Sequence, residues 1–287
     1  MNDNSLSRKI EDYIKNMPSL PVSISRILEI CNQSNVSPAD LNHVISLDPV
    51  LTGRVLKLIN SVYYGLGQKV TSMVRAIIML GINTVKNLAL STAVLGTMPA
   101  NKDIQGINME GFWRHSFCVG VTAKLIAKKT SVDPQQIEEH FTAGLLHDIG
   151  KVSFNAILAG DYLKIVSDAE RNKIPLYKAE EKNLNFNHCT SGEMIVKAWN
   201  LNGPVADAII YHHNLAGYSG NNYKALCIIA ISNYFACVNE IGFSGDREPE
   251  KPVDEIWKTI GIDEDYLEEI KESISKEIDK AKIFLKL

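Results

Sequence analysis

The residues best suited to chemistry are an adjacent histidine and aspartate, His147 and Asp148, at the end of an apolar segment. They lie in the octapeptide GLLHDIGK, residues 144–151. A neutral imidazole beside a carboxylate can bind a divalent cation or serve a proton transfer. Lys151 follows three residues after the aspartate. It is a candidate catalytic residue that would steady a phosphate, and the competing interpretation is a solvated helix lysine.

Four further histidines occur at the ends of predicted helices. They are His115, His188, His212 and His213. Side chains at the ends of separate helices can meet at one point, although neighbours on one helix diverge by about 100°. For any single histidine a structural role is the better interpretation, but the group as a whole favours a cation. His43 and His140 are expected to be ordinary surface or boundary residues.

Several imidazoles with one carboxylate suit iron, manganese, zinc or nickel. A bound cation would lower the pKa of its water and polarise a phosphoryl oxygen, so a nucleotide or phosphate is the ligand class to expect. Cys189 directly follows His188. A thiolate ligand there is an alternative, and a small packing residue is the favoured interpretation.

Composition describes a soluble globular protein without a strong charge bias. The 287 residues are 45% hydrophobic and 22% charged, and the formal net charge is −3. This length is enough for one large or two ordinary domains. The charge balance gives no reason to expect a nucleic-acid partner, because only Arg54, Lys57 and Lys69 gather near an aromatic pair at residues 63–64.

The same sequence argues for a cytoplasmic location and against a membrane. No apolar run approaches the roughly 20 residues that cross a bilayer. The N-terminal residues, MNDNSLSRKIEDYIKN, are polar and do not resemble a signal peptide. Five scattered cysteines without a CxxC motif are expected to be free thiols in a reducing compartment.

Apolar residues recur at three- and four-residue spacing almost everywhere, which predicts an all-α protein. Ser37 and Asp48 each precede a proline and are expected to cap helices. The polar segment 101–108 is the best boundary between two lobes. We therefore expect an N-terminal helical lobe over residues 1–105 and a second helical lobe, with the histidines and a C-terminal helix, over residues 106–287.

The last predicted helix, residues 263–285, begins with acids and ends with lysines, as the helix dipole favours. One apolar stripe runs along it. The favoured interpretation is packing onto its own domain, and the alternative is a partner or dimer helix that makes an oligomer.

Several ordered motifs give the chain a resemblance to the HDOD family, the HD-related output domain of bacterial signalling proteins. The motifs are MPSLP at 17–21, SLDPVLT at 46–52, LINSVYYG at 58–65, AIIMLG at 76–81, FWRH at 112–115, AGLLHDIGK at 143–151 and AIIYHH at 208–213. The resemblance covers roughly residues 17–240 and is much more specific than a lone His-Asp pair.

The resemblance implies a two-lobed, all-helical HDOD or HD-like fold with a metal pocket. Its ligands would be His115, His147, Asp148, His188, His212 and His213. The HD superfamily contains metal-dependent phosphohydrolases, and this ligand order is also similar to that of HD-GYP cyclic-dinucleotide phosphodiesterases. In that comparison, Lys151 stands at the place of the HD-associated lysine.

The chain departs from the enzyme pattern at three places. The final metal-binding aspartate of HD enzymes corresponds to Asn233, and a glutamate one turn before the first histidine corresponds to Gly111. The acidic and GYP residues after the histidine pair are also missing. We expect a degenerate pocket in which the position made by Asp148 with residues 188, 212 and 213 keeps its ligands. The position made by His115, His147 and Asn233 is impaired.

Two functions remain after this comparison. The favoured one is a regulatory or output module of signal transduction, which acts through protein partners or by sensing a ligand. The alternative is a metal-dependent phosphohydrolase or phosphodiesterase. Loss of the carboxylate at Asn233 leans against an enzyme.

Overall fold

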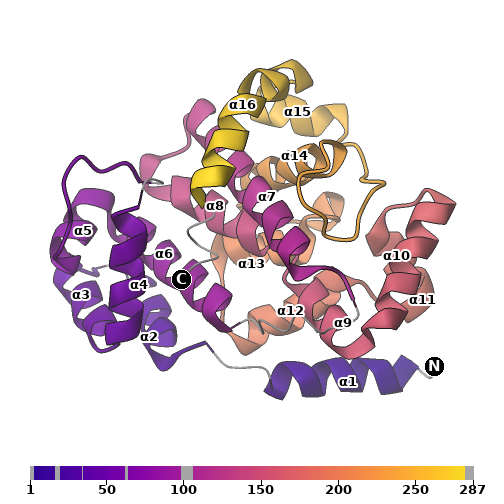
Figure 1. The fold of residues 1–287 in the computed structure, drawn as a ribbon, viewed down its shortest axis with the longest axis horizontal. Helices are drawn as coiled ribbons and strands as arrows, with labels where there is room; N and C mark the ends of the chain where they lie inside the picture. The colour runs from indigo at the N-terminus through magenta and orange to yellow at the C-terminus, as the bar shows by residue number, and fades with distance from the viewer. Residues whose placement is uncertain (1–2, 17–19, 34, 62–63, 98–105, 282–287) are drawn as a thin grey trace.

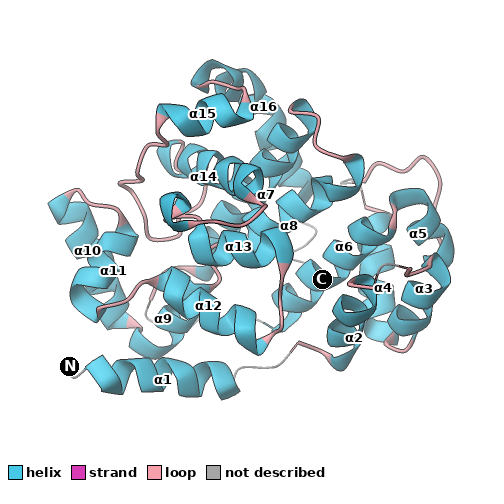
Figure 2. Cartoon of the chain, turned by 180° about the vertical axis from the view of Figure 1, so that it is seen from behind, coloured by secondary structure: helices cyan, strands magenta, loops and turns pink. Residues whose placement is uncertain are grey.

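The computed structural model describes residues 3–16, 20–33, 35–61, 64–97 and 106–281. Over these residues the chain forms α-helices and two short 3₁₀ turns and no strand, which confirms the all-α prediction (Figure 2). The first third contains α1 (Asp3–Asn16), α2 (Val22–Cys31), α3 (Pro38–Ser46), α4 (Pro49–Ile59), α5 (Met73–Leu80) and α6 (Ile82–Thr97).

Helices α7 to α16 make up the rest of the described chain. They are α7 (Met109–Lys129), α8 (Ile137–Leu146), α9 (Gly150–Leu158), α10 (Gly160–Asn172), α11 (Leu176–Leu184), α12 (His188–Ala198), α13 (Gly203–Tyr211), α14 (Tyr223–Val238), α15 (Asp254–Ile260) and α16 (Glu264–Ala281). Figure 1 shows α7, α8 and α13 in the middle of the molecule. Helix α8 packs against α6, α7, α13 and α14 and is the central element of the core.

Local chemistry explains several helix starts. The Ser37 hydroxyl accepts a hydrogen bond from the Asp40 amide, and the Asp48 carboxylate accepts one from the Leu51 amide. Both residues therefore satisfy amides that a helix leaves without an internal partner. The predicted caps of α3 and α4 are confirmed. Helix α4 ends at Ile59.

Helix α8 also joins the N-terminal helices to the region of the His-Asp pair. The Tyr64 hydroxyl donates to the Glu138 carboxylate over 3.1 Å, and the hydroxyls of Ser91 and Thr142 lie 3.3 Å apart. Glu138 and Thr142 are both on α8, whose last residue directly precedes His147. Helix α8 therefore contacts both the N-terminal region and the His-Asp pair.

The first helix does not lie with its neighbours in sequence. Helix α1 packs against α9 and α12, well apart from α3 and α5 in both ribbon views (Figures 1 and 2). Its buried residues are Ile10 and Ile14. The expected lobe boundary at residue 105 falls outside the described residues, so the division into 1–105 and 106–287 stays a prediction.

The structure defines one helix start and one short helix that the sequence pattern does not predict. Helix α12 begins at His188, because the Asn187 side chain accepts hydrogen bonds from the amides of Cys189 and Thr190. Helix α15 has only seven residues, which are too few to display a helical period.

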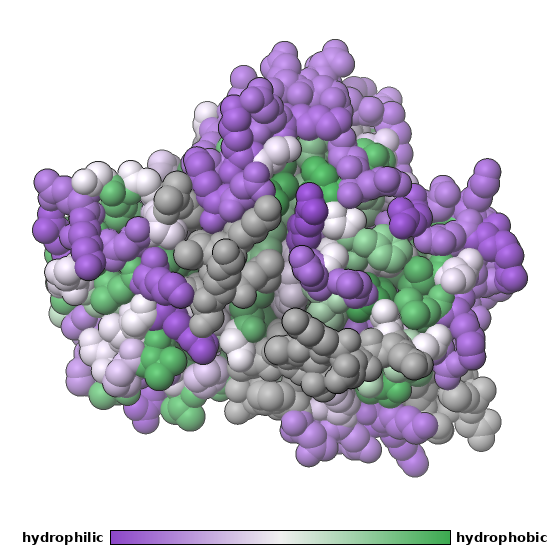
Figure 3. Space-filling view, in the orientation of Figure 1, coloured by the Kyte–Doolittle hydropathy of each residue, from purple (hydrophilic) through white to green (hydrophobic). Residues whose placement is uncertain are grey.

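The apolar stripe of the last helix is buried within the chain. Leu267, Ile274 and Ile278 are buried, and α16 packs against α7. The surface of α15 and α16, at the top of Figure 3, is mostly hydrophilic. Packing onto its own domain, the favoured interpretation, therefore accounts for this stripe, and an oligomer through this helix stays a prediction.

No single described helix has both the length and the hydropathy that a membrane span requires. Helices α5 and α6 pass such a test only as a pair, and they are bent by 117° relative to each other.

Candidate metal centre

The six expected ligands come together from four separate parts of the chain. Their donor atoms form two groups that share one aspartate, and within each group the atoms lie within 4.8 Å of one another. The first group is Asp148, His188, His212 and His213, and the second is His115, His147 and Asp148. The first group has the members that the resemblance implies, and the second contains Asp148 where Asn233 was expected. Metal binding by either group stays a prediction.

Glycines allow the helices that carry these groups to approach each other. A Cβ on Gly150 would overlap the carbonyl oxygen of His188, and a Cβ on Gly144 would lie 2.8 Å from the Cα of Gly120. The first contact seats α9 against the start of α12, and the second seats α8 against α7. Both close approaches require a residue without a side chain.

Three candidate metal-ligand atoms in the pocket have no hydrogen-bond partner. They are Nε2 of His147, Oδ1 of Asp148 and Nε2 of His213, and all are buried. Buried polar atoms are nearly always satisfied, so each such orphan requires an explanation. Three orphans that belong to the same two donor groups fit a bound cation.

The hydrogen bonds of the outer ring nitrogens settle two tautomers. Nδ1 of His147 lies 2.7 Å from the Gly144 carbonyl, and Nδ1 of His212 lies 2.8 Å from the Ala208 carbonyl. A carbonyl only accepts, so each Nδ1 carries the proton. Each Nε2 therefore keeps its lone pair for the pocket, which is the form that binds metal.

Electrostatics keep the pocket in its ligand form. Burial lowers the pKa of His115 and of His212 to about 3 in each case and outweighs the opposing effect of Asp148. Burial raises the pKa of Asp148, but His147 and Lys151 together lower it by more than burial raises it. The pKa of Asp148 therefore lies well below its usual value. His115 and His212 are therefore neutral, and Asp148 is ionised, at neutral pH.

Lys151 is buried and does not face solvent, so the solvated-lysine interpretation is wrong. Its ammonium donates to Asp148 Oδ2 over 2.7 Å and to the Ser244 hydroxyl over 3.3 Å. Burial lowers its pKa, and the carboxylates of Asp148, Glu180 and Asp246 raise it above the usual value. Three buried carboxylates around one buried ammonium leave a formal negative excess that a divalent cation would offset.

A loop that we call the strap, residues 241–250, covers this region. The Phe243 amide donates to the Gly111 carbonyl over 2.9 Å. At its far end, the Tyr177 hydroxyl donates to Glu250 over 2.8 Å. The ring of Tyr177 in turn stacks on His213, with centroids 4.4 Å apart. The strap is thereby joined both to the helix of the first histidine and to a ligand of the first group.

The room left under the strap is very small. The cavity that His115 lines with strap residues has a volume of about 20 Å³. A cavity needs about 10–15 Å³ to hold one water molecule. The space beside His115 under the strap therefore suits a water or an ion and is too small for a phosphoester.

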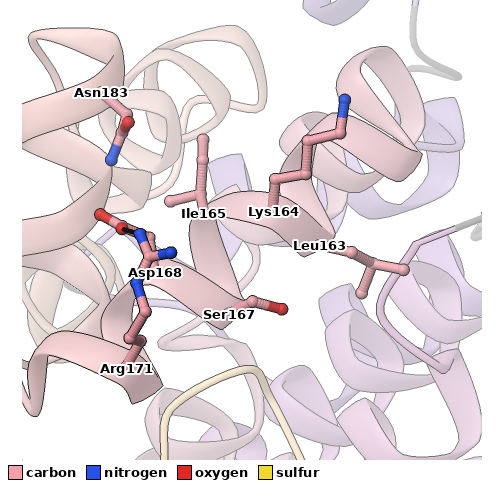
Figure 4. Close-up of a pocket in the computed structure, with 7 residues that line it drawn as sticks. All are labelled: Leu163, Lys164, Ile165, Ser167, Asp168, Arg171 and Asn183. Atoms are coloured by element: carbon pink, nitrogen blue, oxygen red, sulfur yellow. Dashed lines mark hydrogen bonds and ion pairs between the residues drawn. The ribbon is translucent and has the colours of Figure 1, made fainter.

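A separate groove of about 550 Å³ lies on α10 and α11 (Figure 4). Its lining contains none of the six candidate ligands. Its carboxylate, Asp168, is paired with Arg171 at 2.5 Å. The residues that line this groove therefore do not form a metal-binding group like the one around Asp148.

The structure also corrects one histidine and places another residue. His140 is buried, and its Nδ1 donates to the Gln136 carbonyl over 2.9 Å, so it is a structural residue of α8 and not a surface one. Asn233 Oδ1 lies 3.0 Å from His115 Nε2. The amide thus occupies the nitrogen that the second group would offer to a cation. Glu180, which contacts His188, was not identified from the sequence.

We expect Asn233→Asp to add a second cation position. A carboxylate at this site would complete a ligand set with His115, His147 and Asp148. Its charged oxygen is a better ligand for a divalent cation than the neutral amide oxygen of Asn233. Titration with Mn²⁺ should then give two equivalents per chain, compared with one for the unchanged protein. Asn239→Asp, which adds the same charge six residues later at the end of α14, is the control. An unchanged stoichiometry in Asn233→Asp would contradict this interpretation.

Known proteins with similar folds span nearly the whole chain. The crystal structure of an HDOD domain protein of unknown function from Geobacter sulfurreducens is 26% identical, with a TM-score of 0.76 and 98% of each chain covered. A proposed phosphohydrolase from Shewanella amazonensis SB2B is 22% identical, with a TM-score of 0.70 and coverage of 96% of this chain and 98% of that one. The second likeness supports the fold alone.

A sequence relative is an uncharacterised protein of Treponema pallidum (strain Nichols). It is 28% identical over 222 residues, which are 77% of this chain and 42% of the relative. The chain therefore spans well under half of that protein's length. The model of the HDOD domain matches residues 17–215, more than half of the chain, and includes both the N-terminal motifs and the histidine pair. The chain therefore belongs to the HDOD family.

Proposed function

We propose that this protein is a regulatory module of signal transduction. It holds one cation in a closed histidine pocket and acts through contacts with other proteins, without hydrolysing phosphoesters. The observation that carries this proposal is the cavity of about 20 Å³ that His115 lines under the strap, which leaves no room for a phosphoester beside the second donor group. Asp148, His188, His212 and His213 would hold the cation. A bound cation supplies Lewis-acid polarisation, and here it would mainly neutralise the buried carboxylates.

A route from the pocket to the surface supports the regulatory role. Helix α8 ends at the His-Asp pair and is hydrogen-bonded to Tyr64, in the segment between α4 and α5. The N-terminal region exposes the large apolar side chains of Val22, Leu47 and Val50. In Figure 3, hydrophobic patches lie between hydrophilic ones over this part of the molecule, at the left. We propose that a protein partner binds this surface.

A hydrolysis assay tests the proposal directly. Protein loaded with Mn²⁺, Fe²⁺ or Ni²⁺ is incubated with cyclic dinucleotides, nucleoside phosphates and small phosphoesters. We expect turnover no faster than with His147→Ala, which loses a ligand of the second group. An enzyme-like rate that depends on His147 would overturn the proposal.

A metal-dependent phosphohydrolase is the second candidate. Two donor groups that share Asp148 are the arrangement that a two-metal hydrolase needs to hold an attacking and a leaving oxygen. Asn233 beside His115 and the closed strap weigh against it. The same assay separates the two functions.

Closure by the strap gives a prediction of its own. Gly242 has φ of 75°, and a Cβ there would overlap His115 N and the Gly111 carbonyl. Gly242→Ala should lift the strap and speed hydrogen exchange of amides 241–250. Gly81→Ala is the control, because Gly81 has φ of 87° but no atom within 4 Å of an added Cβ. Equal strap protection in both variants would show that the strap does not depend on this contact.

A further inference from the structure

Glu180 is a fully buried carboxylate on α11 that lies behind the pocket. Its Oε2 accepts hydrogen bonds from the His188 amide over 2.9 Å and from His188 Nδ1 over 2.6 Å. Its Oε1 accepts one from the Tyr162 hydroxyl over 2.5 Å. All three donors are supplied by the fold, so the carboxylate has a single orientation.

The bond to the ring determines what His188 presents to the pocket. With its proton on Nδ1, the ring directs the Nε2 lone pair toward Asp148 Oδ1 and His212 Nε2, each 3.3 Å away. The His212 ring also has its proton on Nδ1, as the bond to Ala208 requires. Two nitrogen lone pairs and a carboxylate oxygen thus face one another without a proton between them. This juxtaposition is favourable only around a cation.

We propose that Glu180 is a positioning residue for the cation site, and that it acts by orienting His188 and adding negative charge behind it. The proposal rests on the proposed function, since it assumes the cation. The outer nitrogens of His147 and His212 donate to backbone carbonyls. Of these three described histidines, only His188 has an Nδ1 that donates to a carboxylate. Carboxylate–histidine–metal arrangements raise the basicity of the ligand and fix its ring.

A merely structural role must be separated from this one. Glu180 also accepts from the first amide of α12, so removing its side chain would disturb that helix start as well. Glu180→Gln avoids the difficulty. Its amide oxygen can still accept from both His188 groups, and its NH₂ can donate to the Tyr162 oxygen. The substitution removes the charge and keeps both bonds to His188, while the bond to Tyr162 reverses its direction.

The first measurement is the affinity for Mn²⁺ and for Zn²⁺, each by competition with a chelator. We expect Glu180→Gln to weaken binding by about 10–100-fold, as loss of an outer-shell carboxylate does elsewhere. Glu138→Gln is the matched control. Glu138 is also a buried carboxylate, but it pairs with Lys124 and Tyr64. Its replacement should leave the affinity unchanged. Equal affinities in the wild type and Glu180→Gln would overturn the proposal.

The second measurement needs no metal. Proton–nitrogen NMR of the metal-free protein reports the tautomer of His188 and the shift of its Nδ1 proton. We expect an Nδ1–H tautomer with a strongly downfield proton, which moves upfield in Glu180→Gln because a neutral amide is the weaker acceptor. An Nε2–H tautomer, or an unmoved proton, would overturn the orienting role. If the wild type bound no cation, the proposed function would fail, and this spectrum would still decide what Glu180 does.

Discussion

Asp148→Asn is expected to abolish cation binding and to lower the free energy of unfolding of the metal-free protein by about 3–5 kcal/mol. Asp148 belongs to both donor groups, so no complete ligand set survives its loss. Its other oxygen accepts from Lys151 over 2.7 Å. The substitution leaves the Lys151 ammonium buried without its main counter-charge. Removing one partner of a buried ion pair costs more free energy than replacing both partners with apolar side chains. Urea unfolding in the presence of a chelator, with Mn²⁺ titration of the same samples, measures both effects.

A double variant separates the two losses. Asp148→Asn with Lys151→Met removes the stranded charge along with its partner, and Met fills a similar space. We expect it to recover most of the stability of the wild type and none of the cation binding. If the double variant were as unstable as the single one, the buried pair would not explain the cost. If Asp148→Asn still bound a cation tightly, the shared-ligand geometry would be wrong.

Gly150→Ala is expected to destabilise the fold by about 1–3 kcal/mol or more, through overpacking, and to weaken cation binding. The added Cβ would overlap the His188 carbonyl and lie 2.7 Å from the Gly192 amide. These are backbone atoms, so a rotamer change cannot relieve the clash. Helix α9 would have to move from the start of α12, and His188 would move with it. Chemical unfolding and the same metal titration are the measurements.

The control for this substitution is another helical glycine. Gly53 lies within α4, is exposed, and has no atom within 4 Å of an added Cβ. Gly53→Ala should therefore stabilise the protein by about 0.5–1 kcal/mol, because alanine loses less conformational freedom on folding. A loss of stability in Gly53→Ala comparable with that in Gly150→Ala would show that the close approach of α9 and α12 is not the cause.

Local sequence patterns predicted those parts of the structure that local chemistry controls. The caps at Ser37 and Asp48 follow from side chains that reach amides three residues later. The histidine groups could be named because their positions at helix ends and their order in the chain limit how they can meet. A family resemblance then supplied the pairing of those groups, which periodicity alone does not contain.

Other features depend on contacts between distant segments and left no local mark. Glu180 and Glu181 are adjacent in an ordinary polar helix, and only the fold of α10 to α12 buries the first and exposes the second. The sequence of the strap indicates a polar loop, and its composition does not predict that this loop covers His115. Lys151 is charged, yet it is buried because Asp148 lies one turn before it on the same side.

The central claim is that this chain binds a single cation in a closed pocket. The most direct test is to load the protein with Mn²⁺, remove free metal by gel filtration, and count metal per chain by atomic absorption. We predict one equivalent, absent from a sample of His188→Ala prepared in the same way. A wild type that retained none, or that retained two, would contradict the account.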